Sequence, residues 1–370
     1  MESSGVKWVR LGDYIEQCDE RNTDLRYDIS DVMGMTITKE IISTKANLEG
    51  NDLSKFKIVD PGEFVFNPRT HGKRIGLGLN NTNKAFLISW NNIAFRIAHK
   101  DKLLPNYLYL YFNRDEWDRY ACFNSWGSST EVFTWNELCR MEIPLPSVAE
   151  QQKVVNAWRA FREIKEQNEA KAAPLMQLCQ SYIQELKHKY PMQEIGPYLQ
   201  FFKEKNKDNE IKLEQGINIA KEFITPQRSN SDLSSRIKVR TGQFAYCTQL
   251  NNENVAISLR VGPDCVVSPV YEVFEIKKEY KHILNSEYLL LWLIRKEFGR
   301  YVYWSSVGSA YEFLRYDNLY SYKIPLPPIE VQQAIVNIYK CANEAKQIAE
   351  EADWLSREVC PALLQHVIHS

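Results

Sequence analysis

The chain has 370 residues and a formal net charge of −1, with 44% hydrophobic and 25% charged residues. This length predicts about two domains, and the composition is typical of a soluble globular protein. The sequence has no apolar run near the roughly 20 residues of a membrane span and no signal-peptide pattern at its start, so we expect a cytoplasmic protein without a membrane partner.

The predicted elements form two similar halves. In the first half, short β-leaning runs such as 63–66 precede an amphipathic helix at 107–120; the second half repeats this order with 243–246 and 288–303. The expected fold class is α+β, with two mixed α/β domains joined by two long antiparallel helices that form a coiled coil. The predicted boundaries are 1–147 for the first domain, 148–189 for the first long helix, 190–328 for the second domain and 329–370 for the second long helix.

The starts of both long helices carry residues that suit a helix N-terminus. Ser147 and Glu150 form an S-x-x-E capping box before the first helix. Before the second helix, Pro328 suits the first helical position, and Glu330 suits the positive end of the helix dipole.

Apolar residues at alternating steps of three and four predict a coiled-coil seam on each long helix. Helices of about 40 residues would be roughly 60 Å long, and neither could bury such a stripe alone. The simplest arrangement pairs them antiparallel; the alternative is that each helix packs on its own domain. Pro174 and Pro361 should kink or end these helices. The predicted seam residues are Val154, Phe161, Ile164, Leu175 and Leu178 in the first helix, and Ile335, Ile338, Ala342, Ala345, Val359 and Leu363 in the second.

An internal repeat relates the two halves. The sequence I-P-L-P occurs at 143–146 and again at 324–327, and Gln-Gln occurs at 151–152 and 332–333; both are displaced by 181 positions. A constant displacement over separate motifs indicates duplication of a whole structural unit.

This order of motifs, duplicated at constant spacing, resembles the specificity subunits of type I restriction-modification systems. The resemblance implies that each domain recognises one half of a split DNA sequence, while the paired helices hold the domains apart and dock two methyltransferase subunits, with restriction subunits as further partners. Because the two domains differ, the implied double-stranded target is bipartite and asymmetric. S-adenosylmethionine, ATP and Mg are expected on the partner subunits, and no cofactor or catalytic residue is expected in this chain.

Positive charge is concentrated in one segment of each half. Residues 64–100 contain six Lys and Arg and no Asp or Glu, and residues 233–263 contain four against the single Glu253. Such cations, with nearby hydroxyl and amide groups, predict contacts to phosphates and base edges. The alternatives are solvated loops, and core packing for Trp126 and Trp304. The candidate DNA-binding residues are Arg69, His71, Lys73, Arg74, Arg96, Ser128, Ser129, Thr130, Arg236, Lys238, Arg240, Gln249, Asn251, Asn252, Ser306, Ser309 and Tyr311.

Two other classes of function are considered. Catalysis by this chain is disfavoured, because the only near match to the N-P-P-Y/F motif of amino-methyltransferases is 67–69, and 76–78 lacks the third glycine of a dinucleotide loop. The eight cysteines include no C-x-x-C pair, which predicts reduced thiols and no metal site. A coiled-coil scaffold whose end domains bind proteins remains the alternative, and a salt-dependent affinity for duplex DNA distinguishes the two.

Overall fold

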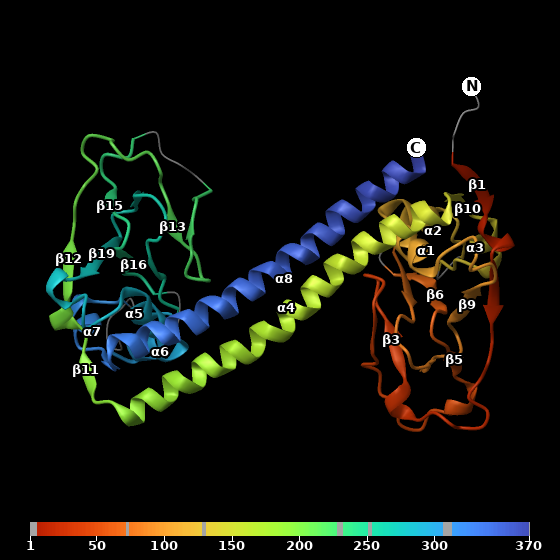
Figure 1. Ribbon diagram of the computed structural model, residues 1–370, viewed down its shortest axis with the longest axis horizontal. Helices are drawn as coiled ribbons and strands as arrows, with labels where there is room; N and C mark the ends of the chain where they lie inside the picture. The colour runs from red at the N-terminus through yellow and green to blue at the C-terminus, as the bar shows by residue number, and fades with distance from the viewer. Residues whose placement is uncertain are drawn as a thin grey trace. The chain divides into compact units, whose positions relative to one another are not determined.

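The computed structural model describes residues 6–71, 74–127, 131–227, 232–250, 254–305 and 313–369 (Figure 1). The chain divides into two compact units: unit 1 comprises Met1–Gln167 and Ile348–Ser370, and unit 2 comprises Asn168–Gln347. Both units combine helices with antiparallel strands, which confirms the predicted α+β fold class. Each of the long helices, α4 (Val148–Lys189) and α8 (Ile329–His369), contributes residues to both units. Within the described ranges, none of the helices has the length and apolar character that a membrane crossing requires.

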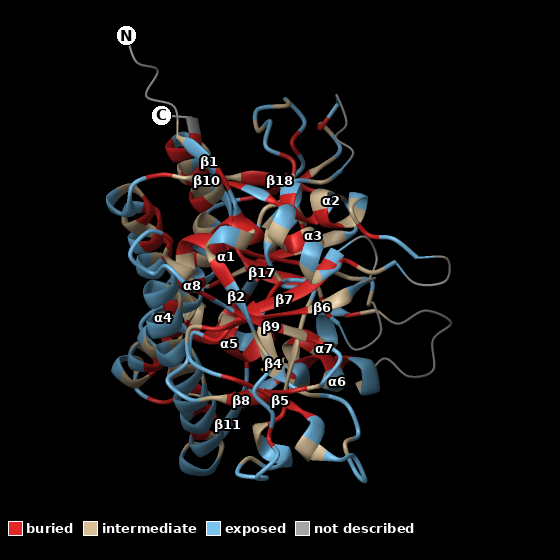
Figure 2. Cartoon of the chain, turned by 90° about the vertical axis from the view of Figure 1, so that its right-hand side faces the viewer, coloured by how far each residue is buried: buried red, intermediate tan, exposed pale blue. Residues whose placement is uncertain are grey.

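Unit 1 is built on a four-stranded antiparallel sheet with the strand order β2-β9-β6-β7. The rings of Phe64 and Phe95 stack at 4.9 Å on this sheet and pack with helices α1 and α2 in one core, which appears as buried segments in Figure 2. Pairs β1–β10, β3–β4 and β5–β8 complete the unit. The elements are β1 (Lys7–Arg10), β2 (Ile15–Cys18), β3 (Met33–Met35), β4 (Ile41–Ser43), β5 (Lys57–Val59), β6 (Phe64–His71), β7 (Arg74–Leu79), β8 (Phe86–Ile88), β9 (Ile93–Ile97), α1 (Pro105–Phe112), α2 (Asp115–Phe123), α3 (Trp135–Arg140) and β10 (Glu142–Leu145).

Unit 2 repeats this topology with the sheet order β12-β19-β16-β17 and the pairs β11–β20, β13–β14 and β15–β18. Phe244 and Phe274 stack at 4.7 Å where unit 1 has its own stacked pair. The elements are β11 (Met192–Glu194), β12 (Leu199–Phe202), β13 (Gly216–Ile217), β14 (Phe223–Ile224), β15 (Ile237–Val239), β16 (Phe244–Cys247), β17 (Ile257–Leu259), β18 (Cys265–Val267), β19 (Tyr271–Ile276), α5 (Ser286–Leu293), α6 (Lys296–Ser305), α7 (Tyr316–Tyr320) and β20 (Lys323–Pro325).

A fully buried glutamine joins the start of α4 to the rest of unit 1. The side-chain oxygen of Gln151 accepts a hydrogen bond from the Leu104 amide at 2.9 Å. Its amide nitrogen donates to the carbonyls of Lys102 at 2.8 Å and Pro146 at 2.9 Å. One planar side chain therefore satisfies three backbone groups from two other segments, which fixes the direction in which the helix leaves the sheet.

The repeat places the same arrangement at the start of α8. Gln332 is also fully buried; it accepts from the Asn285 amide at 2.9 Å and donates to the carbonyls of Ile283 at 2.7 Å and Pro327 at 2.8 Å. We call Gln151 and Gln332, with the backbone groups they bind, the glutamine clasps. The Gln-Gln and I-P-L-P motifs occur together because the last proline of one motif supplies a carbonyl to the first glutamine of the other.

Helices α4 and α8 pack against each other within each unit. In unit 1, Val154 of α4 shares a buried core with Leu364 of α8, and the Lys165 ammonium lies 2.8 Å from the Asp353 carboxylate. In unit 2, Ile183 and Leu186 of α4 share a core with Ile335 and Val336 of α8. Contacts that move forward along α4 move backward along α8, as the predicted antiparallel pairing requires.

The seam departs from the predicted register in two places. Ile164 and Leu178 are 41% and 44% exposed, whereas Cys179, one residue after Leu178, is buried. Near the end of α8, Cys360 and Leu364 are buried, each one residue after a predicted seam residue, Val359 or Leu363. A straight helix drifts by about 20° per heptad from a repeat of 3.5, so a strict heptad prediction falls one residue behind. Of the other predicted seam residues, Val154, Ile335, Ala342 and Ala345 are buried, and Phe161, Leu175, Ile338, Val359 and Leu363 are half-buried.

The two prolines do not end the helices. Pro174 lies within α4 and Pro361 within α8, and both helices continue beyond them. The expectation that either proline ends its helix is therefore wrong. Each proline removes one backbone hydrogen bond, and the packing of the helix before and after it maintains the helical conformation.

Replacing Gln151 with Ala tests the first glutamine clasp. The change leaves the buried Pro146 carbonyl and the part-buried Leu104 amide and Lys102 carbonyl without their partner, so we expect the free energy of unfolding to fall by about 3 kcal/mol. Urea denaturation measures this. The matched control is Gln152→Ala, whose side-chain amide donates to Asn156 on the exposed side of the same helix; its effect should stay within about 0.5 kcal/mol. Equal effects of the two substitutions would contradict the role given to Gln151.

Candidate nucleic-acid interface

Arg69 and Gln249 occupy equivalent positions in the two units. In unit 1, the carbonyl of Pro68, just before Arg69, accepts a 2.8 Å hydrogen bond from the Phe133 amide before α3. In unit 2, the carbonyl of Thr248, just before Gln249, accepts a 2.8 Å hydrogen bond from the Leu314 amide before α7. Each also forms an isolated antiparallel bridge with that segment, Arg69 to Val132 and Gln249 to Phe313. Both side chains are exposed. Arginine pairs with guanine edges and glutamine with adenine edges, so these equivalent positions carry side chains suited to different bases.

Arg74 and Arg96 are exposed cations with weakly held partners. Arg74 lies 3.6 Å from Asp115, and Arg96 pairs with Glu16 on the neighbouring strand β2. The hydrogen bond to Glu16 raises the pKa of Arg96 above its ordinary value. Because exposed ion pairs contribute little to stability, both guanidinium groups can exchange these carboxylates for a phosphate.

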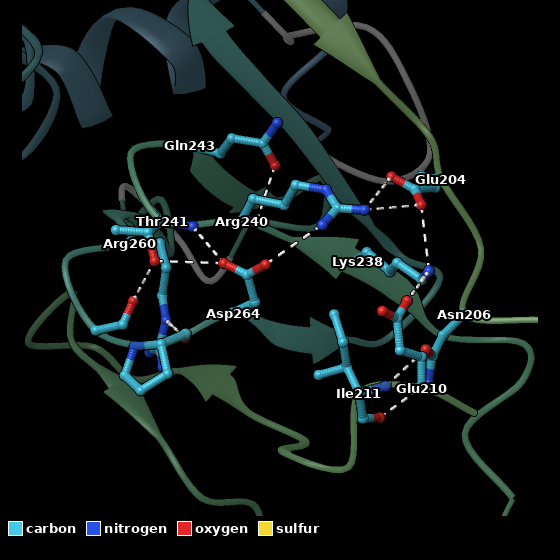
Figure 3. A network of polar contacts seen from close by, with 12 residues as sticks. Glu204, Asn206, Glu210, Ile211, Lys238, Arg240, Thr241, Gln243, Arg260 and Asp264 are labelled. Atoms are coloured by element: carbon cyan, nitrogen blue, oxygen red, sulfur yellow. Dashed lines mark hydrogen bonds and ion pairs between the residues drawn. The ribbon is translucent and has the colours of Figure 1, made fainter. Parts of the chain in front are cut away.

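Lys238 and Arg240 are held by carboxylates of their own unit. The Lys238 side chain is 6% exposed, and its ammonium lies 2.9 Å from Glu210 and 3.2 Å from Glu204 (Figure 3). Arg240 lies 3.0 Å from Glu204 and 3.4 Å from Asp264. Hydrogen bonds to Glu210 and Glu204 raise the pKa values of Lys238 and Arg240 respectively. A contact from Lys238 to DNA would require this network to open.

Lys238 takes a position that unit 1 fills with an apolar residue. Strands β5 and β15 correspond at a displacement of 180 positions, which aligns Ile58 with Lys238. The Ile58 amide donates to the Glu20 carbonyl at 2.8 Å, and the Lys238 amide donates to the Glu204 carbonyl at the same distance. Ile58 is 2% exposed. The lysine therefore occupies a core position, with its ammonium reaching the carboxylates at the rim.

Arg236 likewise replaces Phe56, which packs in an apolar cluster with Val32. Arg236 Nε lies 2.6 Å from Glu214 Oε1, in an ion pair whose geometry is not that of a hydrogen bond. Glu214 corresponds to Val32, because each forms the isolated parallel bridge to β8 or β18. Unit 2 thus has an ion pair where unit 1 has an apolar contact, which favours a structural role for Arg236.

Trp126 and Trp304 are 70% and 75% exposed, so the alternative that they are core residues is wrong. Phe123, the last residue of α2, is 81% exposed and lies 181 positions before Trp304. Sequence reasoning missed Phe123, although the constant displacement of the repeat points to it. Each unit therefore displays large aromatic side chains beside the loop that precedes α3 or α7.

Ten of the candidates cannot be placed. The side chain of His71 is outside the description, although its backbone pairs with Arg74 at the tip of the β6–β7 hairpin. The other nine lie outside the described residues: Lys73, Ser128, Ser129, Thr130, Asn251, Asn252, Ser306, Ser309 and Tyr311. In the part of the chain that the structure describes, no group of three or more His, Cys, Asp and Glu side chains is arranged to hold a metal ion.

Comparison with known proteins identifies the class of fold. Residues 184–341 match a family model described as the type I restriction modification DNA specificity domain; this segment covers less than half of the chain and lies within unit 2. None of the curated proteins compared with the chain matches it. The second half therefore contains a DNA specificity domain.

The resemblance to solved structures extends over the whole chain. The type I restriction-modification S subunit from M. genitalium is similar in fold, with a TM-score of 0.63 and 12% identity over 100% of this chain and 98% of that one. The HsdS subunit from Thermoanaerobacter tengcongensis matches at a TM-score of 0.41 and 18% identity, over 99% of this chain and 97% of that one. The chain therefore shares the fold of the M. genitalium S subunit over its whole length, and its residues 184–341 match the type I restriction modification DNA specificity domain.

The ion pair of unit 2 can be replaced by the apolar pair of unit 1. Arg236→Ala should lower the free energy of unfolding by about 3 kcal/mol, because it removes the ion-pair partner of the buried Glu214 carboxylate. The double variant Arg236→Phe with Glu214→Val copies Phe56 and Val32 and should be at least as stable as the unaltered chain. Urea denaturation gives both values. If the double variant folds but loses affinity for DNA, Arg236 is a contact residue and the structural role is wrong.

Proposed function

We propose that this chain is the non-catalytic, sequence-reading subunit of a type I restriction-modification complex, and that it recognises a bipartite, asymmetric DNA target. Unit 1 would bind one half of the target and unit 2 the other. The observation that carries this proposal is the equivalent placement of two exposed side chains, Arg69 in β6 and Gln249 just after β16. Two copies of one fold that display different base-reading side chains are suited to two unlike half-sites.

We further propose that methyltransferase subunits, two per chain, dock on this protein, with restriction subunits as additional partners. The duplicated topology supports this stoichiometry, because two equivalent surfaces can bind two copies of one partner. Exposed apolar side chains on the long helices, including Leu178, Tyr182 and Trp354, support docking there. In this proposal S-adenosylmethionine, ATP and Mg bind to the partners.

The paired helices would set the length of the spacer between the half-sites. Each helix contributes to the cores of both units, so helix length constrains both ends of the pair. Antiparallel pairing supports this role, because a matched change in both helices preserves every side-chain contact outside the changed segment.

Substitution of the two strand-end residues tests the assignment of half-sites. Arg69→Ala should relax one position in one half of the methylated sequence, and Gln249→Ala should relax a position in the other half. Loss of a bidentate contact should cost about 1 to 3 kcal/mol in discrimination. Methylome sequencing of cells that carry each variant measures this.

Arg96→Ala serves as the comparison, because Arg96 is cationic and exposed but paired along the sheet. It should leave the methylated sequence unchanged. If Arg69→Ala and Gln249→Ala altered the same half-site, or neither, the division of reading between the units would be rejected. If the unaltered chain with its methyltransferase bound no DNA, a protein-binding scaffold would be favoured.

A matched deletion in both helices tests the spacer. Lys165 and Asp353 face each other, so removing 162–168 from α4 and 350–356 from α8 takes one heptad from each side of the pair. The separation should shorten by about 10 Å, which is about three base pairs of DNA. Methylome sequencing should then find the same two half-sites with a shorter spacer. An unchanged spacer would rule out the proposed role of the helices.

A further inference from the structure

Helices α2 and α6 end with the same exposed pair of side chains. On α2, Arg119 is followed four residues later by Phe123, and on α6, Arg300 is followed four residues later by Trp304. Residues four apart lie on one face of a helix. Phe123 is 81% and Trp304 75% exposed, and both arginines are exposed. Each unit therefore displays a guanidinium group and an aromatic ring side by side.

The backbone beneath each pair is held in place. Ala121 and Val302, on the opposite faces of the two helices, are buried in their cores. At the end of α2, the Ser125 hydroxyl donates to the Ala121 carbonyl at 2.6 Å. At the end of α6, the Ser305 hydroxyl donates to the Val302 carbonyl at 3.0 Å. Because the helix ends are capped, binding through these side chains requires little ordering of the backbone.

The pair in unit 1 lies close in the chain to the proposed reading position. Trp126, three residues after Phe123, bridges to Val132 through backbone hydrogen bonds of 3.2 and 3.1 Å. Val132 in turn bridges to Arg69. In unit 2, Phe313 bridges to Gln249, and Asn318 of the following helix α7 donates to the Ser305 hydroxyl at the end of α6 at 2.9 Å. A ligand bound at Arg69 or Gln249 is therefore near the end of α2 or α6.

We propose that Arg119 with Phe123, and Arg300 with Trp304, are matched DNA-positioning contacts. In each pair the guanidinium binds a backbone phosphate, and the ring packs against the adjoining sugar or base step. This inference rests on the proposed function, and it adds residues that hold either half-site without reading it.

The main support for this inference is the difference between these pairs and the proposed base-reading residues, Arg69 and Gln249. Arg69 and Gln249 differ chemically, as unlike half-sites require, whereas the arginine–aromatic pair is the same in both units. Phosphates, sugars and the faces of base pairs are common to every sequence, so contacts to them can be identical in two units that read different bases. The pair of Arg119 with Glu116, at 3.4 Å, is exposed on both sides and is weak enough to give way to a phosphate.

A docked protein subunit is the other occupant to consider, because aromatic residues and arginine are also enriched at protein interfaces. The arginines favour DNA, since each adds a cation beside a strand end that presents a candidate base-reading side chain. The experiment below separates the two occupants.

The test uses the chain assembled with its methyltransferase subunits and measures affinity for target and unrelated duplexes at several salt concentrations. Arg119→Ala and Arg300→Ala should each lower the slope of log affinity against log salt concentration by about 0.9. The affinities for target and unrelated duplexes should fall by the same factor, and the methylated sequence should stay the same.

The aromatic residues are tested in the same assay. Phe123→Ala and Trp304→Ala should each weaken binding by about tenfold, whereas Phe123→Trp and Trp304→Phe should retain it. Trp90→Ala is the matched control, because Trp90 is 60% exposed in the turn between β8 and β9 and is not part of either arginine–aromatic pair. The Trp304 emission, taken as the difference between the unaltered chain and Trp304→Phe, should be quenched by duplex DNA and not by the methyltransferase alone.

Three results would overturn the inference. If the alanine variants fail to co-purify with the methyltransferase, the pairs bind protein. If a variant changes one base of the methylated sequence, its residue reads DNA. If affinity and salt slope are unchanged, the pairs do not contact DNA. Failure of the proposed function is seen separately, because the unaltered complex would then bind the target no better than unrelated DNA before any substitution is made.

Discussion

The glutamine clasps are the interactions on which the rest of the architecture depends. Each clasp satisfies two carbonyls and one amide that would otherwise be buried without partners, and it does so from the second turn of a helix about 40 residues long. A small change in direction at the start of such a helix becomes a large displacement further along it. The planar amide has its donors and its acceptor on opposite sides, so only one orientation satisfies all three groups. The direction of α4 from its own sheet, and of α8 from its own, is therefore set by one side chain in each case.

Much of this fold could be predicted from sequence, because duplication is visible without any structural knowledge. The constant displacement located both mixed domains, both helix starts and the Gln-Gln motifs. What the glutamines bind could not be predicted, because Gln151 reaches Lys102 and Leu104, and no periodicity reports contacts over such a sequence separation. The seam was predicted well where heptads and helix geometry agree, and it slipped by one residue at Ile164 and Leu178. A repeat of 3.5 residues describes a supercoiled pair, and these helices depart from it.

The candidate site was predicted less well, because the charge of each basic segment was counted without the carboxylates of neighbouring segments. The basic segment 233–263 contains one acidic residue, but Glu204, Glu210 and Glu214 lie just before it in the chain and fold onto Arg236 and Lys238. Sequence gives the charge of a side chain, and only the fold determines whether that charge faces solvent. Arg69 and Gln249 were selected for their chemistry alone, and their equivalence became evident only through their bridges to the segments before α3 and α7.

The two units keep the same arginine and carboxylate at the start of α2 and α6, although the aromatic residue beneath the arginine differs. At the start of α2, Arg114 lies over the Tyr111 ring at 5.2 Å and pairs with Glu116 at 3.3 Å. At the start of α6, Arg295 lies over the Trp292 ring at 5.3 Å and pairs with Glu297 at 2.7 Å, and this hydrogen bond lowers the pKa of Glu297 to about 2. The aromatic partner has changed, but the stacked arginine and its carboxylate remain. A helix anchored in this way at one end, and capped at the other, presents its outer face in the same orientation in both units. In the proposed function, that shared orientation would let both units hold DNA in the same way, while Arg69 and Gln249 would recognise different bases.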